Sequence, residues 1–578
     1  MGLRILLVAL VAIVGVYCDG EADLITDLPG LLFTPNFKSY SGYVDANAGG
    51  TWKMHYMLTE SRSKPDTDPL LVWFNGGPGC SSLGGLFEEL GPFYVNYDGQ
   101  TLYENPYAWN AKANVLYLES PIGVGYSYDT TTPGYFKAND DQSAQQNLMA
   151  LSNFFTKAQP KYGNRTFYLS GESYAGIYIP MLTDLIVQGI TASPTPTFPN
   201  TNFAGSAIGN GFMNVRGLLN ALTLWSAYHG RVSVQDWEAI KTKCVKGADV
   251  DTFDFSQFTV SSNNIDYVGD SSECGQLIQP LISQNANNDE GFDQYNFYQE
   301  CYDSSAFEVA APPPPASGKR TKRNAIQGTS SQTKHIQKPS KLAFTGTSSL
   351  AANTATLVNR YSNDNQWGYF CWNEDAVGKY LNSDAVQNAL HIPQEWKNQK
   401  NGWEDCRMNI YNNYTLTYGT TNQFFKNIMT NLKTDFRFLI YNGDVDTVCN
   451  YLGDAYHIRQ VAAENGLTAS NKRAPWYYSS NKQLAGYSQT YTGKNQNGAN
   501  IIIDVVTVKG AGHMVPYDRA GPSVQMISNF VWAKPNDPID YTSSANFNPV
   551  ITLSPMKGNT SNISIFLSIC AVIISYFM

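Results

Sequence analysis

Six continuous apolar runs constrain the fold of this chain more than any other feature. They occupy residues 69–74 (PLLVWF), 114–119 (NVLYLE), 166–171 (TFYLSG), 203–211 (FAGSAIGNG), 436–444 (FRFLIYNGD) and 501–510 (IIIDVVTVKG). Runs of this length are typical of strands that are buried on both faces in a parallel sheet. Between them, residues 141–158 show helical spacing, and near the start residues 40–61 resemble an antiparallel hairpin. The alternation predicts an α/β fold, with a mostly parallel central sheet and helices on both faces.

The regular alternation breaks between about residues 212 and 369. This region starts with a helical stretch and then becomes polar and irregular, and we interpret it as an insertion that caps the carboxyl edge of the sheet. Within it, residues 312–341 contain four consecutive prolines followed by basic and Ser/Thr-rich residues, a composition that cannot build a packed core. We expect a disordered loop there. Arg320-Thr-Lys-Arg323 resembles a furin-type processing site, which would yield a two-chain protein, or is simply a solvated basic loop.

Both ends of the chain carry apolar segments. A short positive region and an apolar run predict a secretory signal peptide over residues 1–18, with an uncleaved anchor as the alternative. At the other end, the tail 541–578 finishes in an apolar segment, 563–578, that is short for a membrane span. It resembles a GPI-anchor signal, and a plain hydrophobic tail or a marginal membrane helix are the competing interpretations. Residues 24–540 would then form one domain, which the secretory pathway would carry to the lysosome or outside the cell.

Composition narrows the classes of partner. Hydrophobic residues make up 43% of the chain, which is enough for a sizeable core, and charged residues make up only 15%. The net charge of −9 argues against a nucleic-acid partner. The chain contains no CxxC spacing, which would have indicated a structural zinc site. We therefore expect neither a metal nor another cofactor. Asn164 and Asn413 stand in N-x-T triplets and are candidate glycosylation sites that fit secretion.

A candidate nucleophile lies at the end of the third apolar run. The stretch Gly171-Glu-Ser-Tyr-Ala-Gly176 has the G-x-S-x-G spacing, with a predicted strand before it and a helical pattern after it. This context is the strand–elbow–helix setting in which a sharp turn holds a serine hydroxyl clear of the sheet. The spacing alone is weak evidence, but with its context it makes Ser173 a candidate catalytic serine.

A catalytic serine needs a base and an orienting carboxylate. Of the six histidines, only His513 follows a buried-looking strand through a tight turn of small residues. Asp444 and Asp446 both follow the run at 436–444 and are the candidate carboxylates. The order Ser, Asp, His along the chain is that of the α/β-hydrolase fold.

Six ordered motifs make the chain resemble the serine carboxypeptidase family, and within it the lysosomal type. They are VWFNGGPGCSSLGGLFEELGPF, LYLESPIGVGYSY, GESYAGIYIP, IGNGF, YNGDVDTVCNYLGD and GAGHMVPYDRAGP, spread over most of residues 34–532. The resemblance implies that Asp446, rather than Asp444, completes a triad with Ser173 and His513. It also implies an oxyanion hole formed by the backbone N–H groups of Gly77 and Tyr174. Removing one such donor typically lowers the rate by about 10²–10³.

The resemblance further implies that four residues surround the terminal carboxylate of a substrate, namely Asn75, Gly76, Glu89 and Glu172. Two glutamates suit an anion only if they are protonated. Two close, partly buried carboxyls cannot both ionise cheaply, so at least one pKa rises, and a protonated carboxyl is a hydrogen-bond donor. We therefore expect peptide C-termini to bind best in acid, while neutral ester or amide ends tolerate a higher pH.

Because an odd number of cysteines is left after the signal peptide and the tail, at least one should be a free thiol or form a bridge between chains. The resemblance implies a bridge between Cys80 and Cys371 that spans the insertion, and we consider Cys274–Cys301 a plausible bridge inside it. By resemblance Cys449 is a free thiol that lines the substrate pocket. Cys244 and Cys406 stay unassigned.

The sequence therefore predicts a serine-type exopeptidase that removes single residues from the C-termini of peptides or proteins through an acyl-enzyme. One rival is an acyltransferase on the same scaffold, which passes the acyl group to an alcohol. Another is a stabilising or adhesive protein that retains a hydrolase fold, although a complete triad argues against a purely structural role. Lipase activity is disfavoured, because Asn75, Glu89 and Glu172 suit a carboxylate end. The resemblance also makes a homodimer an expected alternative to a monomer.

Overall fold

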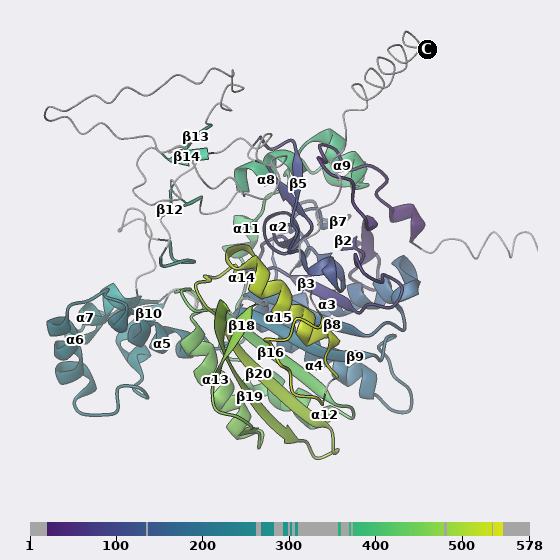
Figure 1. The fold of residues 1–578 in the computed structure, drawn as a ribbon. Helices are drawn as coiled ribbons and strands as arrows, with labels where there is room; N and C mark the ends of the chain where they lie inside the picture. The colour runs from purple at the N-terminus through teal and green to yellow at the C-terminus, as the bar shows by residue number, and fades with distance from the viewer. Residues whose placement is uncertain are drawn as a thin grey trace, which may run out of the picture.

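The computed structural model describes residues 20–546, apart from 97, 135–136, 262–266, 283–292, 299–300, 303–306, 310–356, 360–368, 371–373, 479–482 and 535. Its centre is a twelve-stranded sheet in which ten strands follow one another in the order β1-β2-β6-β3-β8-β9-β16-β20-β19-β17, while β7 pairs with β2 and β18 pairs with β19 (Figure 1). The strands are β1 (Ser39–Asp45), β2 (Trp52–Thr59), β3 (Leu70–Phe74), β6 (Asn114–Leu118), β7 (Tyr128–Asp129), β8 (Phe167–Ser173), β9 (Phe203–Gly211), β16 (Phe436–Gly443), β17 (Thr468–Ala469), β18 (Ala474–Tyr478), β19 (Gln483–Lys494) and β20 (Asn500–Val508).

The six apolar runs form the contiguous middle of this sheet, and all of them are parallel. They are the strands β6, β3, β8, β9, β16 and β20. Strands β1 and β2 form the expected antiparallel hairpin, and β19 adds an antiparallel edge on the opposite side. The prediction of a mostly parallel sheet is confirmed, and all six carboxyl ends point to one edge.

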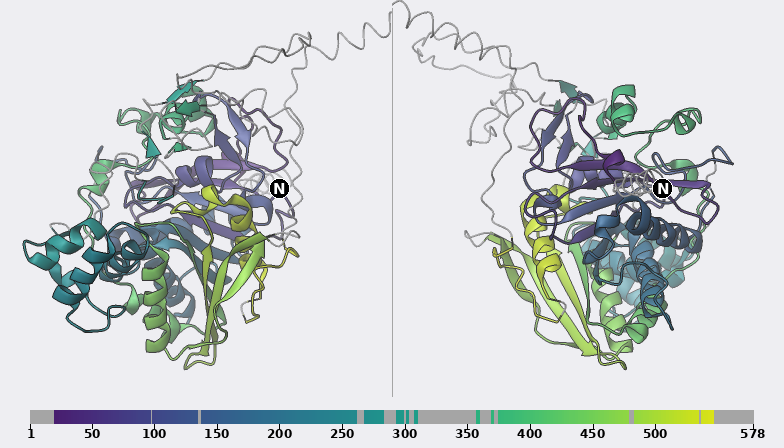
Figure 2. Two further views of the ribbon diagram at one scale, coloured as in Figure 1. Left: turned by 60° about the vertical axis from the view of Figure 1, so that its left-hand side comes forward. Right: turned by 90° about the vertical axis from the view of Figure 1, so that its right-hand side faces the viewer.

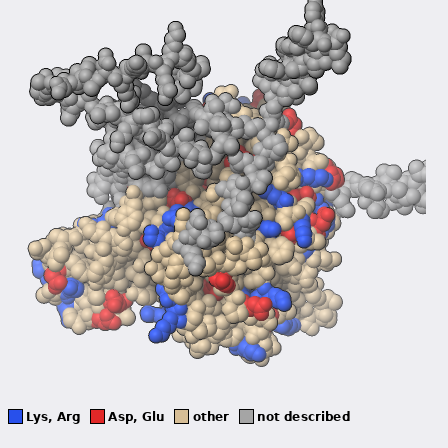
Figure 3. Space-filling view, in the orientation of Figure 1, with Lys and Arg blue, Asp and Glu red and all other residues tan. Residues whose placement is uncertain are grey.

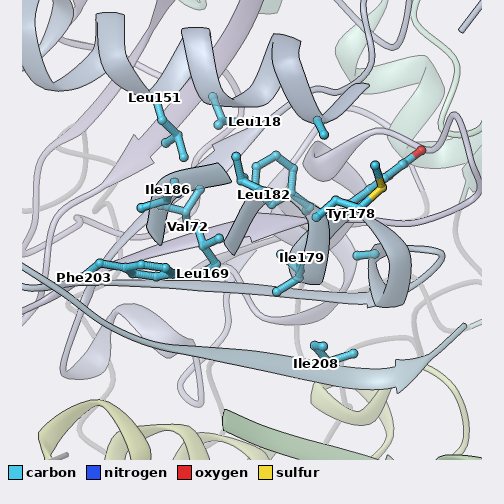
Figure 4. Packing of buried hydrophobic residues seen from close by; sticks show 14 of the residues in the cluster. Val72, Leu118, Leu151, Leu169, Tyr178, Ile179, Leu182, Ile186, Phe203 and Ile208 are labelled. Carbon is cyan, nitrogen blue, oxygen red and sulfur yellow. The ribbon is translucent and has the colours of Figure 1, made fainter. Parts of the chain in front are cut away.

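Each face of the sheet supports its own hydrophobic core. Along β3, Leu70, Val72 and Phe74 belong to one cluster, whereas Leu71 and Trp73 belong to the other, because successive side chains of a strand point to opposite faces. The first cluster packs under α3 (Asp140–Asn153), α4 (Ala175–Thr191), α12 (Asn422–Asn431) and α13 (Tyr451–Glu464), and the second under α15 (Ala520–Trp532). Figure 4 shows Leu182 and Ile186 of α4 close to Val72 and Leu169 of the sheet. The expected helices on both faces are therefore present.

The shorter elements connect these layers. The helices are α2 (Ser82–Gly84), α8 (Glu374–Leu381), α9 (Asp384–Ala389), α10 (Gln394–Lys397), α11 (Met408–Tyr411) and α14 (Val515–Asp518). The strands form small two-stranded sheets: β4 (Phe93–Val95) with β5 (Leu102–Glu104), β10 (Thr259–Ser261) with β11 (Tyr267–Gly269), β12 (Cys301–Tyr302) with β15 (Tyr369–Phe370), and β13 (Phe307–Val309) with β14 (Leu357–Asn359).

The described part of the predicted insertion has a small core of its own. Helices α5 (Val215–Tyr228), α6 (Val234–Ile240) and α7 (Glu273–Ile282) enclose a third hydrophobic cluster. They project from one side of the main body (Figure 2). The predicted disordered loop, residues 312–341, lies outside the described residues, as does its dibasic stretch.

Two disulfides correct the pairings expected from the sequence. Cys80 is joined to Cys406, not to Cys371, because Cys80 and Cys406 face each other in an isolated antiparallel bridge. Cys274 is joined to Cys244, not to Cys301, because both sulfur-bearing residues pack into the third hydrophobic cluster. Cys371 lies outside the described residues. Cys449 is a free, buried thiol, as expected.

No helix in the described part of the chain is long and apolar enough to cross a membrane. The predicted signal peptide (1–18) and the apolar tail segment (563–578) lie outside that part. Figure 3 shows acidic and basic side chains interspersed over the visible face, without a large area of one sign.

Candidate active site

Ser173 occupies a strained turn between β8 and α4. It ends β8 with a φ of 59°, a left-handed conformation that is uncommon for a residue with a side chain. The two glycines of the motif allow this turn to pack closely. A Cβ on Gly171 would lie 2.4 Å from Phe74 O, and one on Gly176 would lie 2.4 Å from Phe212 N. The strand–elbow–helix geometry predicted for Ser173 is therefore present.

His513 and Asp446 meet at the carboxyl end of the sheet. His513 follows β20, Asp446 follows β16, and His513 Nδ1 lies 2.7 Å from Asp446 Oδ2. Asp444, the other candidate, accepts a hydrogen bond from Gly510 N–H at 2.7 Å instead. A histidine that donates from Nδ1 keeps Nε2 available as a base.

Four hydrogen bonds converge on the Asp446 carboxylate, which is fully buried. Its Oδ1 accepts from Val448 N–H at 2.8 Å, and its Oδ2 accepts from Cys449 N–H at 3.1 Å, from Asn210 Nδ2 at 2.8 Å and from His513 Nδ1. Hydrogen bonds to the charged form of a carboxylate favour that form. The site therefore provides for a buried anion at position 446.

A cavity of about 430 Å³ lies beside Ser173. Seven of the nine residues predicted for catalysis and substrate binding line it: Asn75, Gly76, Gly77, Glu89, Glu172, Ser173 and His513. The two others are Asp446, which stands behind His513, and Tyr174, which follows Ser173 in the chain. The structure therefore brings the predicted site residues together from elements far apart in the sequence.

The loop after β3 approaches the serine turn very closely. A Cβ on Gly76 would lie 2.5 Å from Tyr174 N and 2.7 Å from Ser173 Cβ, so only glycine fits there. Gly77 has a φ of 104°, which also requires glycine. This contact puts the backbone of the Gly76–Gly77 loop beside the Tyr174 N–H, the two parts from which the oxyanion hole was predicted.

Glu89 and Glu172 form a buried acidic pair. Glu89 is 5% exposed and Glu172 is 4% exposed. Asn75 Nδ2 donates to Glu89 Oε1 at 3.0 Å and to Glu172 Oε1 at 3.2 Å. If both carboxyls were ionised, neither Oε2 atom would have a donor, whereas a proton on one lets it donate to the other.

Protonation of this pair follows from its surroundings. Burial, and then repulsion from Glu89, raise the pKa of Glu172 well above its ordinary value. Burial also raises the pKa of Glu89, against the opposing effect of the hydrogen bond from Asn75. Because the two groups share their surroundings, they titrate as one pair, and that pair holds a proton above the usual pH range of a glutamate.

Sequence reasoning missed three features of the site. Asn210, at the end of β9, donates to Asp446. Tyr295, from the predicted insertion, accepts a hydrogen bond from the His513 backbone N–H through its carbonyl oxygen at 2.7 Å, and its ring lies tilted beside the imidazole, with 4.9 Å between the ring centroids. Cys406 lines the cavity with Cys80. The IGNG stretch was recognised as a motif, but only the folded structure shows which group its asparagine contacts.

Other expectations have mixed outcomes. Cys449 has no exposed surface and is not among the residues that line the cavity, so its predicted place in the pocket wall is wrong. Asn164 and Asn413 are both exposed, as glycosylation would require. Within the described ranges, no cluster of three or more His, Cys, Asp or Glu residues could hold a metal ion.

The sheet order, the serine elbow and the Asp–His pair define an α/β-hydrolase. In agreement, the structure superposes on the crystal structure of Kex1(Δ)p, a prohormone-processing carboxypeptidase from Saccharomyces cerevisiae. The TM-score is 0.60 and the identity 19%, over 88% of this chain and 95% of that one.

Residues 29–533 match the serine carboxypeptidase family, and the chain belongs to it. It is 76% identical to the Caenorhabditis elegans serine carboxypeptidase ctsa-3.1, over 99% of both chains. It is also 32% identical to the lysosomal protective protein of Mus musculus, over 89% of this chain and 94% of that protein.

Proposed function

We propose that this protein removes single residues from the C-termini of peptides through an acyl-enzyme on Ser173, and that it does so best in acid. The observation that carries the proposal is a hydrogen-bonded Asp446–His513 pair whose histidine lines the same cavity as the strained Ser173 and a buried pair of carboxyls. A hydroxyl, a base with its orienting carboxylate, and a place for a chain end are the three parts that such an exopeptidase needs.

Catalysis begins with proton transfer. His513 Nε2 takes the proton of the Ser173 hydroxyl as its oxygen attacks the carbonyl carbon of the last peptide bond. The resulting oxyanion accepts hydrogen bonds from the N–H groups of Gly77 and Tyr174. His513 then gives the proton to the leaving nitrogen as the C–N bond breaks. In the second half of the reaction, His513 Nε2 takes a proton from water as the water oxygen attacks the acyl carbon, and returns it to Ser173 Oγ as the ester C–O bond breaks.

The carboxylate of the leaving residue is bound by Asn75, the backbone of Gly76 and the Glu89–Glu172 pair. A carboxylate needs hydrogen-bond donors, and the pair provides one only while it holds a proton. As the pH rises through the raised pKa of the pair, the proton leaves, and two anions then repel the chain end. Binding of free-acid peptides therefore weakens with rising pH.

An acidic compartment suits this dependence. We propose that the chain enters the secretory pathway through the signal peptide at residues 1–18 and acts in the lysosome or outside the cell. Similarity to a protein named for the lysosome supports the first site, and exposed glycosylation acceptors at Asn164 and Asn413 fit both. Attachment to a membrane through the tail at 541–578 and assembly into a homodimer are further proposals.

The proposal is tested with an N-blocked dipeptide and its C-terminal amide, each at about pH 5 and about pH 7.5, on either side of the carboxyl and histidine titrations. We expect the free acid to be cleaved chiefly at the lower pH and the amide to lose less activity at the higher pH. The Ser173→Ala variant should retain its thermal unfolding midpoint and lose cleavage of both. Cleavage that persists in this variant, or a free acid cleaved equally at both values, would contradict the proposal.

A further inference from the structure

Strand β9 lies between the strand that carries Ser173 and the strand that leads to Asp446. Its neighbours are β8 on one side and β16 on the other. Asn210 stands near its carboxyl end, fully buried, with a φ of 38°. Burial of the polar amide costs free energy, and so does the left-handed backbone conformation. The hydrogen bonds of the side chain show what offsets these two costs.

Both ends of the Asn210 side chain have partners in the segment that carries Asp446. Nδ2 donates to Asp446 Oδ2 at 2.8 Å and to Cys449 O at 3.3 Å, and Oδ1 accepts from Gly443 N–H at 2.9 Å. The amide therefore spans the turn between the end of β16 and Cys449, and it makes the only side-chain donation to Asp446, apart from that of His513, recorded in the part of the chain that the structure describes.

The two residues after Asn210 contact the serine turn and the start of α13. Phe212 N–H donates to Ser173 O at 2.8 Å. Gly211 N–H donates to Asp454 Oδ2 at 2.9 Å, at the start of α13. Three consecutive residues, the last two of β9 and the one that follows it, thus connect the nucleophile turn, the carboxylate turn and the helix that follows it.

We propose that Asn210 is a positioning residue for the reaction: its amide orients Asp446 toward His513 Nδ1 and sets the spacing between the Asp446 and Ser173 turns. The inference rests on the proposed function, because it assigns Asn210 a task only if Asp446 and His513 act as a pair. Asn210 is fully buried and is not among the residues that line the cavity beside Ser173.

A purely structural role for Asn210 has a different signature. Asparagine is enriched in left-handed conformations, so position 210 could serve the backbone alone. Asn210→Gly separates the two roles, since glycine adopts the φ of 38° without strain but lacks the amide. If the amide positions Asp446, kcat falls roughly 10- to 100-fold, the effect of one hydrogen bond to a charged group, while KM changes little. A kcat within about twofold of the unmodified protein would overturn the inference.

Asn210→Asp provides a second signature, in the pH profile. Protonated, the new carboxyl can donate to Asp446 as the amide does, and it can still accept from Gly443 N–H. Ionised, it can no longer donate to Asp446 and repels it, which moves the Asp446 carboxylate away from its place beside His513 Nδ1. Asp446 is the titratable group that contacts position 210, and the titratable groups that interact with Asp446 in turn are His513, Asp454, Cys449, Glu172 and Asp293.

The variant should therefore be closest to the unmodified protein in acid and lose kcat progressively as the pH rises. The amide substrate is used for the profile, because it bypasses the titration of Glu89 and Glu172. A profile parallel to that of the unmodified protein between about pH 5 and 8 would overturn the inference.

Asn200→Asp is the matched control. Asn200 is also fully buried, lies just before β9, and donates through Nδ2 to the carbonyls of Tyr162 and Arg165, far along the strand from Asp446. Its replacement should lower the unfolding midpoint and leave the shape of the pH profile unchanged. A profile that shifts as much in Asn200→Asp as in Asn210→Asp would count against a specific role for Asn210.

Failure of this inference and failure of the proposed function are distinguishable. If Ser173→Ala abolishes cleavage while both Asn210 variants match the unmodified protein, the proposed function stands and the positioning role falls. If Ser173→Ala retains cleavage, the proposed function falls, and the positioning role falls with it. Should Asn210→Gly not fold, the profile of Asn210→Asp decides the question.

Discussion

Two sets of buried carboxyls belong to the site around Ser173, and they differ in their supply of hydrogen-bond donors. Asp446 is fully buried and accepts four hydrogen bonds, two of them from backbone N–H groups. Glu89 and Glu172 are nearly as buried, yet share the donors of the Asn75 amide, and their Oε2 atoms have none while the pair is ionised.

The difference shows that burial alone does not decide the charge of a carboxyl. Burial penalises the anion in both places. At Asp446 the donors are aimed at the anion, and its orientation toward His513 follows from them. At the glutamate pair the donors are too few for two anions, so burial and mutual repulsion keep a proton between them. One set thus suits a fixed negative charge, and the other suits a hydrogen-bond donor that titrates.

Asp446→Asn breaks the anionic side of the comparison and should have the largest effect. The amide would take part in the same turn but present the wrong partner to His513 Nδ1, which favours the tautomer that cannot accept the serine proton. We expect kcat to fall by about 10⁴, measured on the amide substrate, with a small change in KM. A loss of less than about tenfold in the folded variant would mean that Asp446 does not orient the base.

Glu172→Gln alters the titrating side and should change the pH dependence more than the rate. Glutamine is a neutral donor at every pH, so the chain end keeps a partner after the wild-type pair would have lost its proton. In the unmodified protein, KM for the free-acid dipeptide should increase between about pH 5 and about pH 7.5. In Glu172→Gln we expect this increase, taken as the ratio of the two KM values, to be roughly tenfold smaller, which is the effect of about one hydrogen bond to a charged group. The C-terminal amide serves as the control substrate, and equal KM profiles for both proteins would contradict the assignment.

The same variant should also change stability with a predictable sign. A carboxyl whose folded-state pKa is raised above its unfolded value binds more protons when folded, so the free energy of unfolding falls as the pH rises from the unfolded pKa to the folded pKa. Glutamine removes this loss. The unfolding midpoint of Glu172→Gln should therefore exceed that of the unmodified protein by more at about pH 7.5 than at about pH 5. The reverse order would show that Glu172 is ionised in the folded protein.

The sequence was sufficient for the features that depend on local patterns. Six apolar runs predicted the parallel middle of the sheet, and the hairpin at its edge followed from alternation and glycines. The serine elbow followed from its two glycines, because their spacing is imposed by close backbone contacts. Resemblance then selected Asp446 over Asp444, which the spacing in the turn could not do.

Features that depend on long-range packing could not be predicted from the sequence. Both predicted disulfides had the wrong partner, because a bridge needs two Cα atoms a few ångströms apart, and no local pattern shows which cysteines meet after folding. Cys449 was placed in the pocket wall, although it is buried behind Asp446. Asn210 is part of the IGNG motif, but its role could not be predicted, because its contact with Asp446 joins β9 to the turn that follows β16.

Asp454 has fewer hydrogen-bond donors than Asp446 and more than either Glu89 or Glu172. The Asp454→Asn variant tests this intermediate case and should have the smallest effect. Asp454 is 1% exposed, and both of its donors, Gly211 N–H and Asn442 Nδ2, reach Oδ2, while Oδ1 has none. Burial raises the pKa of Asp454 well above its ordinary value, despite the hydrogen bond from Asn442. By the donor argument, this carboxyl is neutral in the folded protein.

Asparagine preserves a neutral side chain of the same shape at position 454. We expect kcat to stay within about threefold, the pH profile to keep its shape, and the free energy of unfolding to change by at most about 1–3 kcal/mol, the cost of one buried group without a partner. Chemical denaturation and a pH series on the amide substrate measure both quantities. A shifted pH profile would mean that Asp454 carries a charge that acts on Asp446. The number of hydrogen-bond donors would then fail to explain why some buried carboxyls of this protein are anionic and others protonated.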